Sequence, residues 1–231
     1  MFTATLQLDC AWRRLADGVD SNAAGKDPPI LNPSWILLII LQLLAGPPLD
    51  VQVDREYGLP RWYDPGILPE AALALEAMTE DAFAEGVRLQ VYSGYRSYQD
   101  QERTLERESK GSGDQTFTYL ALPGHSEHQL GAAFDVVWPG LAVEMLEPRN
   151  LTLYAWLADN AHQYGYVISY PLKHSNNWPF SNRWMPVSTE YIYEPWHLRY
   201  VGLELAQTMF AQGYLDPESS VLPQDFYRPW P

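Results

Sequence analysis

The sequence contains little cysteine and little positive charge. Its 231 residues include one cysteine, Cys10, which excludes an intramolecular disulfide and any cysteine-based zinc site. Lys and Arg number 15 against 29 Asp and Glu, so the formal net charge is −14. A nucleic-acid partner would need a basic surface, and we therefore expect none.

A long apolar segment is also missing. Residues 35–45 form a short, mostly apolar run that is closed by Gly46-Pro47-Pro48, whereas a membrane-spanning helix needs about 20 apolar residues. The run has the length of a signal-peptide core but lies far from Met1. An export signal or membrane anchor, an interfacial segment and a buried helix all remain open, and the first is favoured. We expect residues 1–46 to be an appendage, with possible membrane association through residues 35–45.

The rest of the chain alternates between helical and strand-like patterns. Residues 47–67 are punctuated by Pro and Gly and are expected to be an extended linker that packs on a domain spanning residues 68–231. A helix is expected from Pro69 to Gly86, with Leu75, Met78, Ala82 and Phe83 facing inward. A second is expected from Tyr98 to Lys110, after a capping box formed by Ser97 and Asp100. Two more are expected from a cap at Asn150 to Gly165 and from Gly202 to Gly213. Strands are expected over residues 87–92, 133–137, 166–170 and 189–194.

The most chemically informative stretch runs from Pro123 to Asp135. His128 and Asp135 lie in it, and His197 follows far downstream, three residues after Glu194. Three N/O donors and one open position are typical of a catalytic zinc, and the additional carboxylate has the character of a general base for a water molecule.

The spacing of these residues is compatible with one site. His128 and Asp135 are seven residues apart, which in an unbroken strand would put them on opposite faces. Gly131 can bend the chain between them. Asp135 would project from an apolar strand, where a cation would offset the cost of burying its charge. The strand over residues 189–194 is expected to end at Pro195, with His197 just beyond it.

Three motifs in this order resemble the VanY-type D-alanyl-D-alanine carboxypeptidases, which belong to a wider group that includes lysostaphin-like enzymes and the hedgehog fold. The motifs are Ser93-Gly94-Tyr95-Arg96-Ser97, Ser126-x-His128-x-x-Gly131-x-Ala133-x-Asp135 and the stretch from Glu194 to Gly202. The resemblance covers roughly Leu68 to Gly213. It implies an α+β fold in which helices pack on one side of a small, mainly antiparallel sheet, with a zinc cleft on the other side.

The same resemblance implies the roles of the site residues. Zn²⁺ would be held by His128, Asp135 and His197, with Glu194 as the base. Arg96 would stabilise the charge that develops on the scissile carbonyl, a task that suits a planar and permanently charged guanidinium. Ser126, Tyr95 and Trp196 are candidates for substrate binding, and His125 and Glu127 for contacts to the metal ligands or the substrate. The loop over residues 173–187 is either a lid or specificity loop or a surface insertion.

The function implied is removal of the terminal D-alanine from peptidoglycan stem peptides. An L,D-carboxypeptidase or a peptidoglycan endopeptidase on the same fold is the alternative, followed by a non-catalytic wall-binding domain, against which Glu194 argues. A wall enzyme must meet its substrate outside the membrane, so we expect an extracytoplasmic protein. We also expect it to be a monomer.

Overall fold

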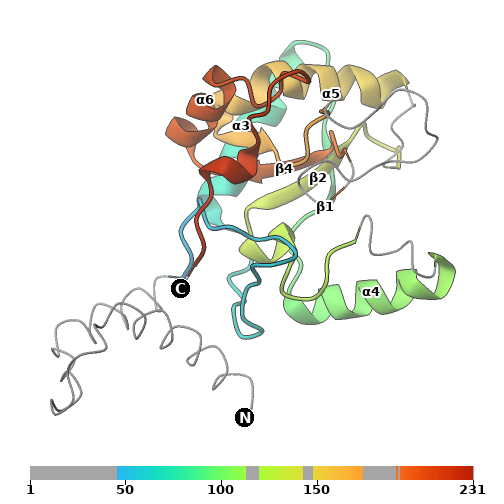
Figure 1. Cartoon of the computed structure of the whole chain (residues 1–231). Helices are drawn as coiled ribbons and strands as arrows, with labels where there is room; N and C mark the ends of the chain where they lie inside the picture. The colour runs from blue at the N-terminus through green and yellow to red at the C-terminus, as the bar shows by residue number, and fades with distance from the viewer. Residues whose placement is uncertain (1–45, 113–119, 143–147, 174–190, 192, 231) are drawn as a thin grey trace, which may run out of the picture. The chain divides into compact units, whose positions relative to one another are not determined.

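Four strands form one antiparallel sheet in the order β1–β2–β4–β3 (Figure 1). The computed structural model describes residues 46–112, 120–142, 148–173, 191 and 193–230. In chain order its elements are α3 (Pro69–Ala84), β1 (Gln90–Ser93), α4 (Tyr98–Ser112), η2 (Glu127–Leu130), β2 (Ala133–Val137), α5 (Pro148–Asn160), η3 (Ala161–Tyr164), β3 (Tyr166–Ile168), β4 (His197–Tyr200), α6 (Leu203–Ala211) and η4 (Pro223–Phe226).

The main core lies between one face of this sheet and the helices α3 and α5, as Figure 1 shows. Alternation along each strand assigns residues to the two faces. Phe134 and Val136 of β2, Leu198 of β4 and Ile168 of β3 pack in this core. Asp135 and His197 therefore belong to the opposite face. The expected α+β architecture, with an antiparallel sheet and a helical layer on one side, is confirmed.

The start of β4 differs from the prediction. A strand over residues 189–194 was expected, but Tyr193 and Glu194 are not in a strand, and residues 189, 190 and 192 lie outside the described part of the chain. The strand begins instead at His197, which pairs with Asp135 of β2. Its pattern is hard to recognise because both faces are buried, with His197 and Arg199 on the polar one.

The predicted cap of α5 is also wrong. Asn150 lies inside the first turn of a helix that begins at Pro148. Its Oδ1 accepts a hydrogen bond from the Trp138 amide at 2.8 Å, and its Nδ2 donates to the Ala142 carbonyl at 2.9 Å. The side chain therefore fixes the turn after β2 and does not cap its own helix. The helix also ends earlier than expected, at Asn160, and the 3-10 turn η3 continues to Tyr164.

Phe83, which was expected to face inward, and Val91 are both exposed. Phe83 at the end of α3 is 62% exposed and lies under the guanidinium of Arg88. Val91 is 41% exposed because β1 is an edge strand that begins only at Gln90 and has an irregular register beside Ser93. The strand β3 ends at Ile168, two residues before the predicted end. Ser97 and Asp100 do exchange the hydrogen bonds expected of a capping box at α4.

The segment before α3 packs on the sheet domain. Val51, Val53 and Leu59 are buried and form a second cluster with Leu130 and Ala132. Residues 1–45, with the apolar run, and residues 174–187 of the expected loop lie outside the described residues. Among the helices that the structure describes, none has the length and apolar character needed to cross a membrane.

Candidate active site

The turn η2 brings His128 to the polar face of the sheet. Ser126 precedes this turn and its hydroxyl accepts the amide hydrogen of His128 at 3.4 Å. Gly131 ends the turn with φ of 75°, and a Cβ at this position would lie 2.0 Å from the carbonyl oxygen of Gly66. Only glycine fits such a position without strain. The bend predicted at Gly131 is therefore present, and it redirects the chain into β2, which carries Asp135.

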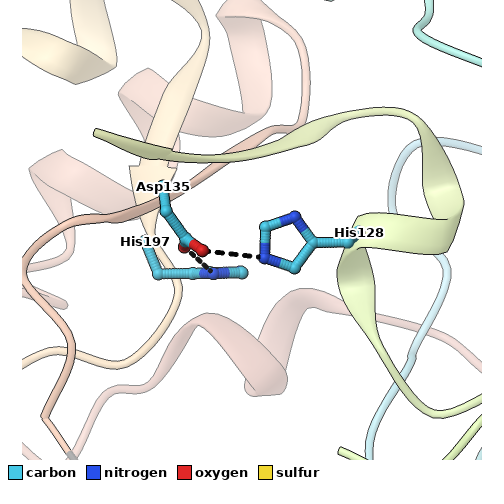
Figure 2. Close-up of side chains that lie close together, drawn as sticks. All are labelled: His128, Asp135 and His197. Atoms are coloured by element: carbon cyan, nitrogen blue, oxygen red, sulfur yellow. Dashed lines mark hydrogen bonds and ion pairs between the residues drawn. The ribbon is translucent and has the colours of Figure 1, made fainter. Parts of the chain in front are cut away.

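His128, Asp135 and His197 converge in one buried group (Figure 2). One donor atom from each lies within 4.8 Å of the other two. His128 Nε2 is 3.2 Å from Asp135 Oδ2, and His197 Nδ1 is 2.9 Å from Asp135 Oδ1. The two imidazole rings are nearly perpendicular, with centroids 5.0 Å apart.

The protonation pattern of this group fits a bound cation. His128 Nδ1 lies 2.7 Å from the Gly94 carbonyl oxygen and must carry its proton there. Burial lowers the pKa of His128, although Asp135 raises it, so the ring is neutral and its Nε2 presents a lone pair to the carboxylate. Two acceptors in contact repel one another unless a cation lies between them. The donor set and its arrangement therefore suit a divalent metal ion.

A second layer of polar groups holds His197 from behind. Its Nε2 is 3.1 Å from Glu127 Oε2, which also accepts a hydrogen bond from the Ser169 hydroxyl at 2.6 Å. Arg199 Nη1 donates to the other oxygen, Oε1, at 2.7 Å. Burial alone would raise the pKa of Glu127, but Arg199, His197 and Ser169 together lower it to about 2. Glu127 is thus a permanently ionised carboxylate behind a metal ligand, a common feature of metal sites.

Glu194 and Arg96 complete the reactive groups. Glu194 is nearly buried, and burial, with further contributions from Asp135 and Glu127, raises its pKa to about 8 in the metal-free protein. Its backbone is fixed by Tyr170, whose carbonyl accepts the Glu194 amide at 3.1 Å. Arg96 follows β1, and its Nε is buried without a hydrogen-bond partner among the described residues. The carboxyl of Glu194, with its raised pKa, and the guanidinium of Arg96, with its unpaired Nε, therefore line the same space.

That space is a cavity of about 320 Å³. The lining residues that were predicted are Arg96, Ser126, Glu127, His128, Asp135, Glu194, Trp196 and His197. The others are Leu120, Ala121, Tyr170 and Tyr191. Two predicted residues lie elsewhere. The Tyr95 hydroxyl donates to Asp64, and His125 Nδ1 lies 2.6 Å from the Asp54 carbonyl oxygen.

Sequence reasoning named Glu127 but missed its partners Ser169 and Arg199. The signal for Arg199 was available. In a strand, residues two apart share a face, so a strand starting at His197 places Arg199 beside the metal ligand. A strand over residues 189–194, as predicted, does not contain His197 or Arg199 and so does not indicate this relation. Nothing in the sequence around Ser169 distinguishes it from an ordinary buried serine.

Known proteins resemble this chain over the same region. Residues 66–203 match the family described as VanY, D-alanyl-D-alanine carboxypeptidase. A D-alanyl-D-alanine carboxypeptidase of Enterococcus faecalis is 34% identical over 149 residues, which are 60% of this chain and 50% of that protein. The bifunctional D-Ala-D-Ala dipeptidase and carboxypeptidase VanXYC of Enterococcus gallinarum is 31% identical and covers 65% of this chain and 75% of its own.

The YodJ protein of Bacillus subtilis is 34% identical over 178 residues, and the match spans 61% of its length. This chain thus covers between one half and two thirds of the length of YodJ and of the Enterococcus faecalis enzyme.

Two solved structures share the fold with a TM-score of 0.58. One is a variant of the vancomycin-resistance D,D-pentapeptidase VanY in complex with Zn(II), 27% identical, covering 76% of this chain and 97% of that one. The other is the LdcB LD-carboxypeptidase, 30% identical, covering 75% and 83%. The chain belongs to the VanY D-alanyl-D-alanine carboxypeptidase family.

Proposed function

We propose that this protein is a zinc-dependent D,D-carboxypeptidase that releases the terminal D-alanine of peptidoglycan stem peptides. The observation that carries the proposal is the convergence of His128, Asp135 and His197 in a cavity that also exposes Glu194 and Arg96. Membership of the VanY family points to the same substrate class, and a solved relative was obtained with D-Ala-D-Ala bound.

His128 Nε2, a carboxylate oxygen of Asp135 and His197 Nδ1 would hold the zinc ion. When bound, zinc acidifies a water molecule toward neutral pH and polarises the carbonyl of the scissile bond. The protein's own groups orient these ligands: the Gly94 carbonyl fixes His128, and the Glu127 carboxylate fixes His197.

Glu194 accepts the proton of the attacking water and passes it to the leaving amine. Burial raises the pKa of Glu194 in the metal-free protein, and a zinc ion in the same cavity would lower it, so that the carboxylate is ionised when it accepts the proton. Arg96 carries a buried guanidinium with an unsatisfied Nε at the same cavity. A hydrogen bond from it to the oxyanion would strengthen as charge develops, and interactions of this kind lower the barrier selectively. Ser126 and Trp196 line the cavity and contact the peptide in this proposal, whereas Tyr95 does not line it.

An L,D-carboxypeptidase is the second candidate. The LdcB LD-carboxypeptidase has the same TM-score and a slightly higher identity than the VanY structure. The two activities differ in the stereochemistry of the residue before the cleaved bond.

The family's substrate class places the activity outside the cytoplasmic membrane. We propose that residues 1–46 form an appendage whose apolar run, residues 35–45, acts as an export signal or anchor, and that residues 68–231 form the catalytic domain. We also propose that the enzyme is a monomer.

The test measures D-alanine release by purified protein from two peptides. One is a stem pentapeptide that ends in D-Ala-D-Ala, and the other is the tetrapeptide that ends in a single D-Ala. Each is assayed as prepared, after chelation and after zinc is restored. Zinc-dependent release from the pentapeptide is the expected result. Release from the tetrapeptide alone would assign the L,D activity. No release from either peptide by folded, zinc-loaded protein would refute both carboxypeptidase activities.

A further inference from the structure

The buried guanidinium of Arg199 connects the metal ligand His197 to a distant part of the backbone. Its Nη1 donates to Glu127 Oε1 at 2.7 Å, and Glu127 Oε2 lies 3.1 Å from Nε2 of His197. Its Nη2 donates to two carbonyl oxygens, those of Leu49 at 2.9 Å and Val51 at 2.5 Å. We call residues 47–53, which supply these carbonyls, the strap.

The strap is itself firmly placed. Val51 is fully buried and packs with Leu130 and Ala132. Leu130 ends the turn η2 that carries His128, and Ala132 directly precedes β2, which carries Asp135. Its backbone also pairs with the C-terminal tail, because the Gln52 amide donates to the Arg228 carbonyl at 2.7 Å and the Arg228 amide donates to the Asp50 carbonyl at 2.9 Å. The strap therefore presents its carbonyls at fixed positions.

Arg199 in turn has little freedom to move. It is fully buried, and its guanidinium carbon lies 4.0 Å from the ring centroid of Tyr227. The planar fork of a guanidinium can serve several acceptors at once in a set geometry. Here one nitrogen serves the carboxylate and the other serves the strap, so the orientation of the strap determines where the Glu127 carboxylate is held.

Glu127 transmits this orientation to the metal site. One of its oxygens accepts from Arg199, and the other accepts from Ser169 and faces His197, so both oxygens are engaged. We propose that the strap, Arg199 and Glu127 form a positioning chain that holds Nε2 of His197 and thereby turns Nδ1 toward the metal. The strap precedes residue 66, where the family match begins, and would be a working part of the metal site.

This inference rests on the metal ligands of the proposed function and not on its substrate. Loss of a hydrogen-bond partner behind a ligating histidine typically weakens metal binding by about 10–100-fold. We expect Glu127→Gln to raise the zinc dissociation constant within this range. Arg199→Lys keeps the charge but loses the fork, and we expect it to weaken zinc binding as well.

The experiment measures zinc affinity by competition with a chromophoric chelator and the absorption spectrum of the Co²⁺-loaded protein. Circular dichroism of the metal-free protein checks folding. Glu102→Gln is the matched control, because it makes the same change in an exposed side chain. Among the described residues, the ion pair of Glu102 is with Arg61, which is also exposed, at 3.3 Å. The control should bind zinc as the unmodified protein does. Glu127→Gln that folds, binds zinc equally well and gives an unchanged Co²⁺ spectrum would overturn the proposal.

A milder variant keeps the test decisive if Glu127→Gln does not fold. Ser169→Ala removes one of the hydrogen bonds to Glu127, at 2.6 Å, and leaves the charges in place. We expect a smaller loss of zinc affinity together with a shifted Co²⁺ spectrum. Unchanged affinity and spectrum in this folded variant would count against the positioning chain.

The role of the strap is tested by hydrogen exchange, because coupling between two sites is reciprocal. If the strap helps to place His197, then zinc should slow exchange at the amides of Val51 and Gln52. In Arg199→Lys this zinc-dependent protection should shrink, whereas the zinc response of the helix α4 should match that of the unmodified protein. Strap amides that exchange at the same rate with and without zinc would overturn the strap's part. All of these measurements report binding, so they stay interpretable whichever peptide the enzyme cleaves.

Discussion

Zinc binding should release a proton from His197. In the metal-free protein, His197 lies between two carboxylates, with Nδ1 2.9 Å from Asp135 and Nε2 3.1 Å from Glu127. Burial lowers its pKa, but hydrogen bonds to both carboxylates outweigh burial and raise the pKa to about 10. The ring is therefore an imidazolium at neutral pH. A metal ion at Nδ1 must displace that proton.

The pKa sets the size of the effect. A pH of 7 lies about three units below the pKa of the His197 ring. Each unit corresponds to about 1.4 kcal/mol, so removing the proton lowers the free energy of zinc binding by ~4 kcal/mol in magnitude. The sign follows directly: below the pKa, raising the pH removes the competing proton. The zinc association constant should therefore rise about tenfold per pH unit between pH 6 and pH 8. Burial lowers the pKa of His128, so its proton competes with zinc less than that of His197 does.

Glu194 complicates the measurement, since its pKa of about 8 makes it a second source of protons. The assay is therefore run on Glu194→Gln, which removes this titration. Isothermal calorimetry in buffers of different ionisation enthalpy counts the protons released, and chelator competition gives the affinity at each pH. We expect about one proton per zinc at pH 6.5. A proton count near zero, together with a zinc affinity that does not change with pH, would refute the conclusion that His197 is protonated before zinc binds.

Four further predictions follow from the same geometry. Glu194→Gln should retain zinc, measured by metal analysis, and lose turnover by about 10²–10⁴-fold, and near-full activity would contradict its role as base. Leu153→Ala, deep in the helical core, should cost about 2–5 kcal/mol of unfolding free energy in denaturant titrations without changing the zinc dissociation constant. Because the pKa of Glu127 falls from 4.5 to about 2 on folding, its stabilising contribution is present above pH 4.5 and lost as the pH falls toward 2, and acid titration of Glu127→Gln should lack that component. A stem pentapeptide with an amidated C-terminus should bind zinc-loaded Glu194→Gln more weakly than the free acid does, and equal dissociation constants would exclude a carboxylate-binding role for the cavity.

The sequence led to the three residues that the structure brings together because their chemistry is local and visible. Imidazoles and a carboxylate beside an apolar strand stand out, and a glycine between His128 and Asp135 permits the bend that joins them. The bend is required by a close approach to Gly66, which no sequence pattern displays. The capping box at Ser97 was predictable for the same reason, since both partners lie within one turn.

The features that were missed depend on contacts between distant segments. Asn150 has the composition of a cap, yet it bonds to the turn at residues 138–142. The strand at His197 is buried on both faces, so its alternation of polar and apolar residues has no exposed side to mark it. Arg199 is the clearest case, because a buried arginine in a strand has meaning only with its partners, Glu127 and the carbonyls of residues 49 and 51.

The charges around the cavity explain why so many ionisable groups can be buried together. Three carboxylates, those of Glu127, Asp135 and Glu194, lie with the two guanidiniums of Arg96 and Arg199 around one site. When all five are ionised and His197 is an imidazolium, their charges cancel. Burying an uncompensated charge is costly. A divalent cation that displaces the His197 proton would change the sum from 0 to +1. The metal would therefore relieve the repulsion among the carboxylates and also make the cavity attractive to a peptide that ends in a carboxylate, in a protein whose overall charge is −14.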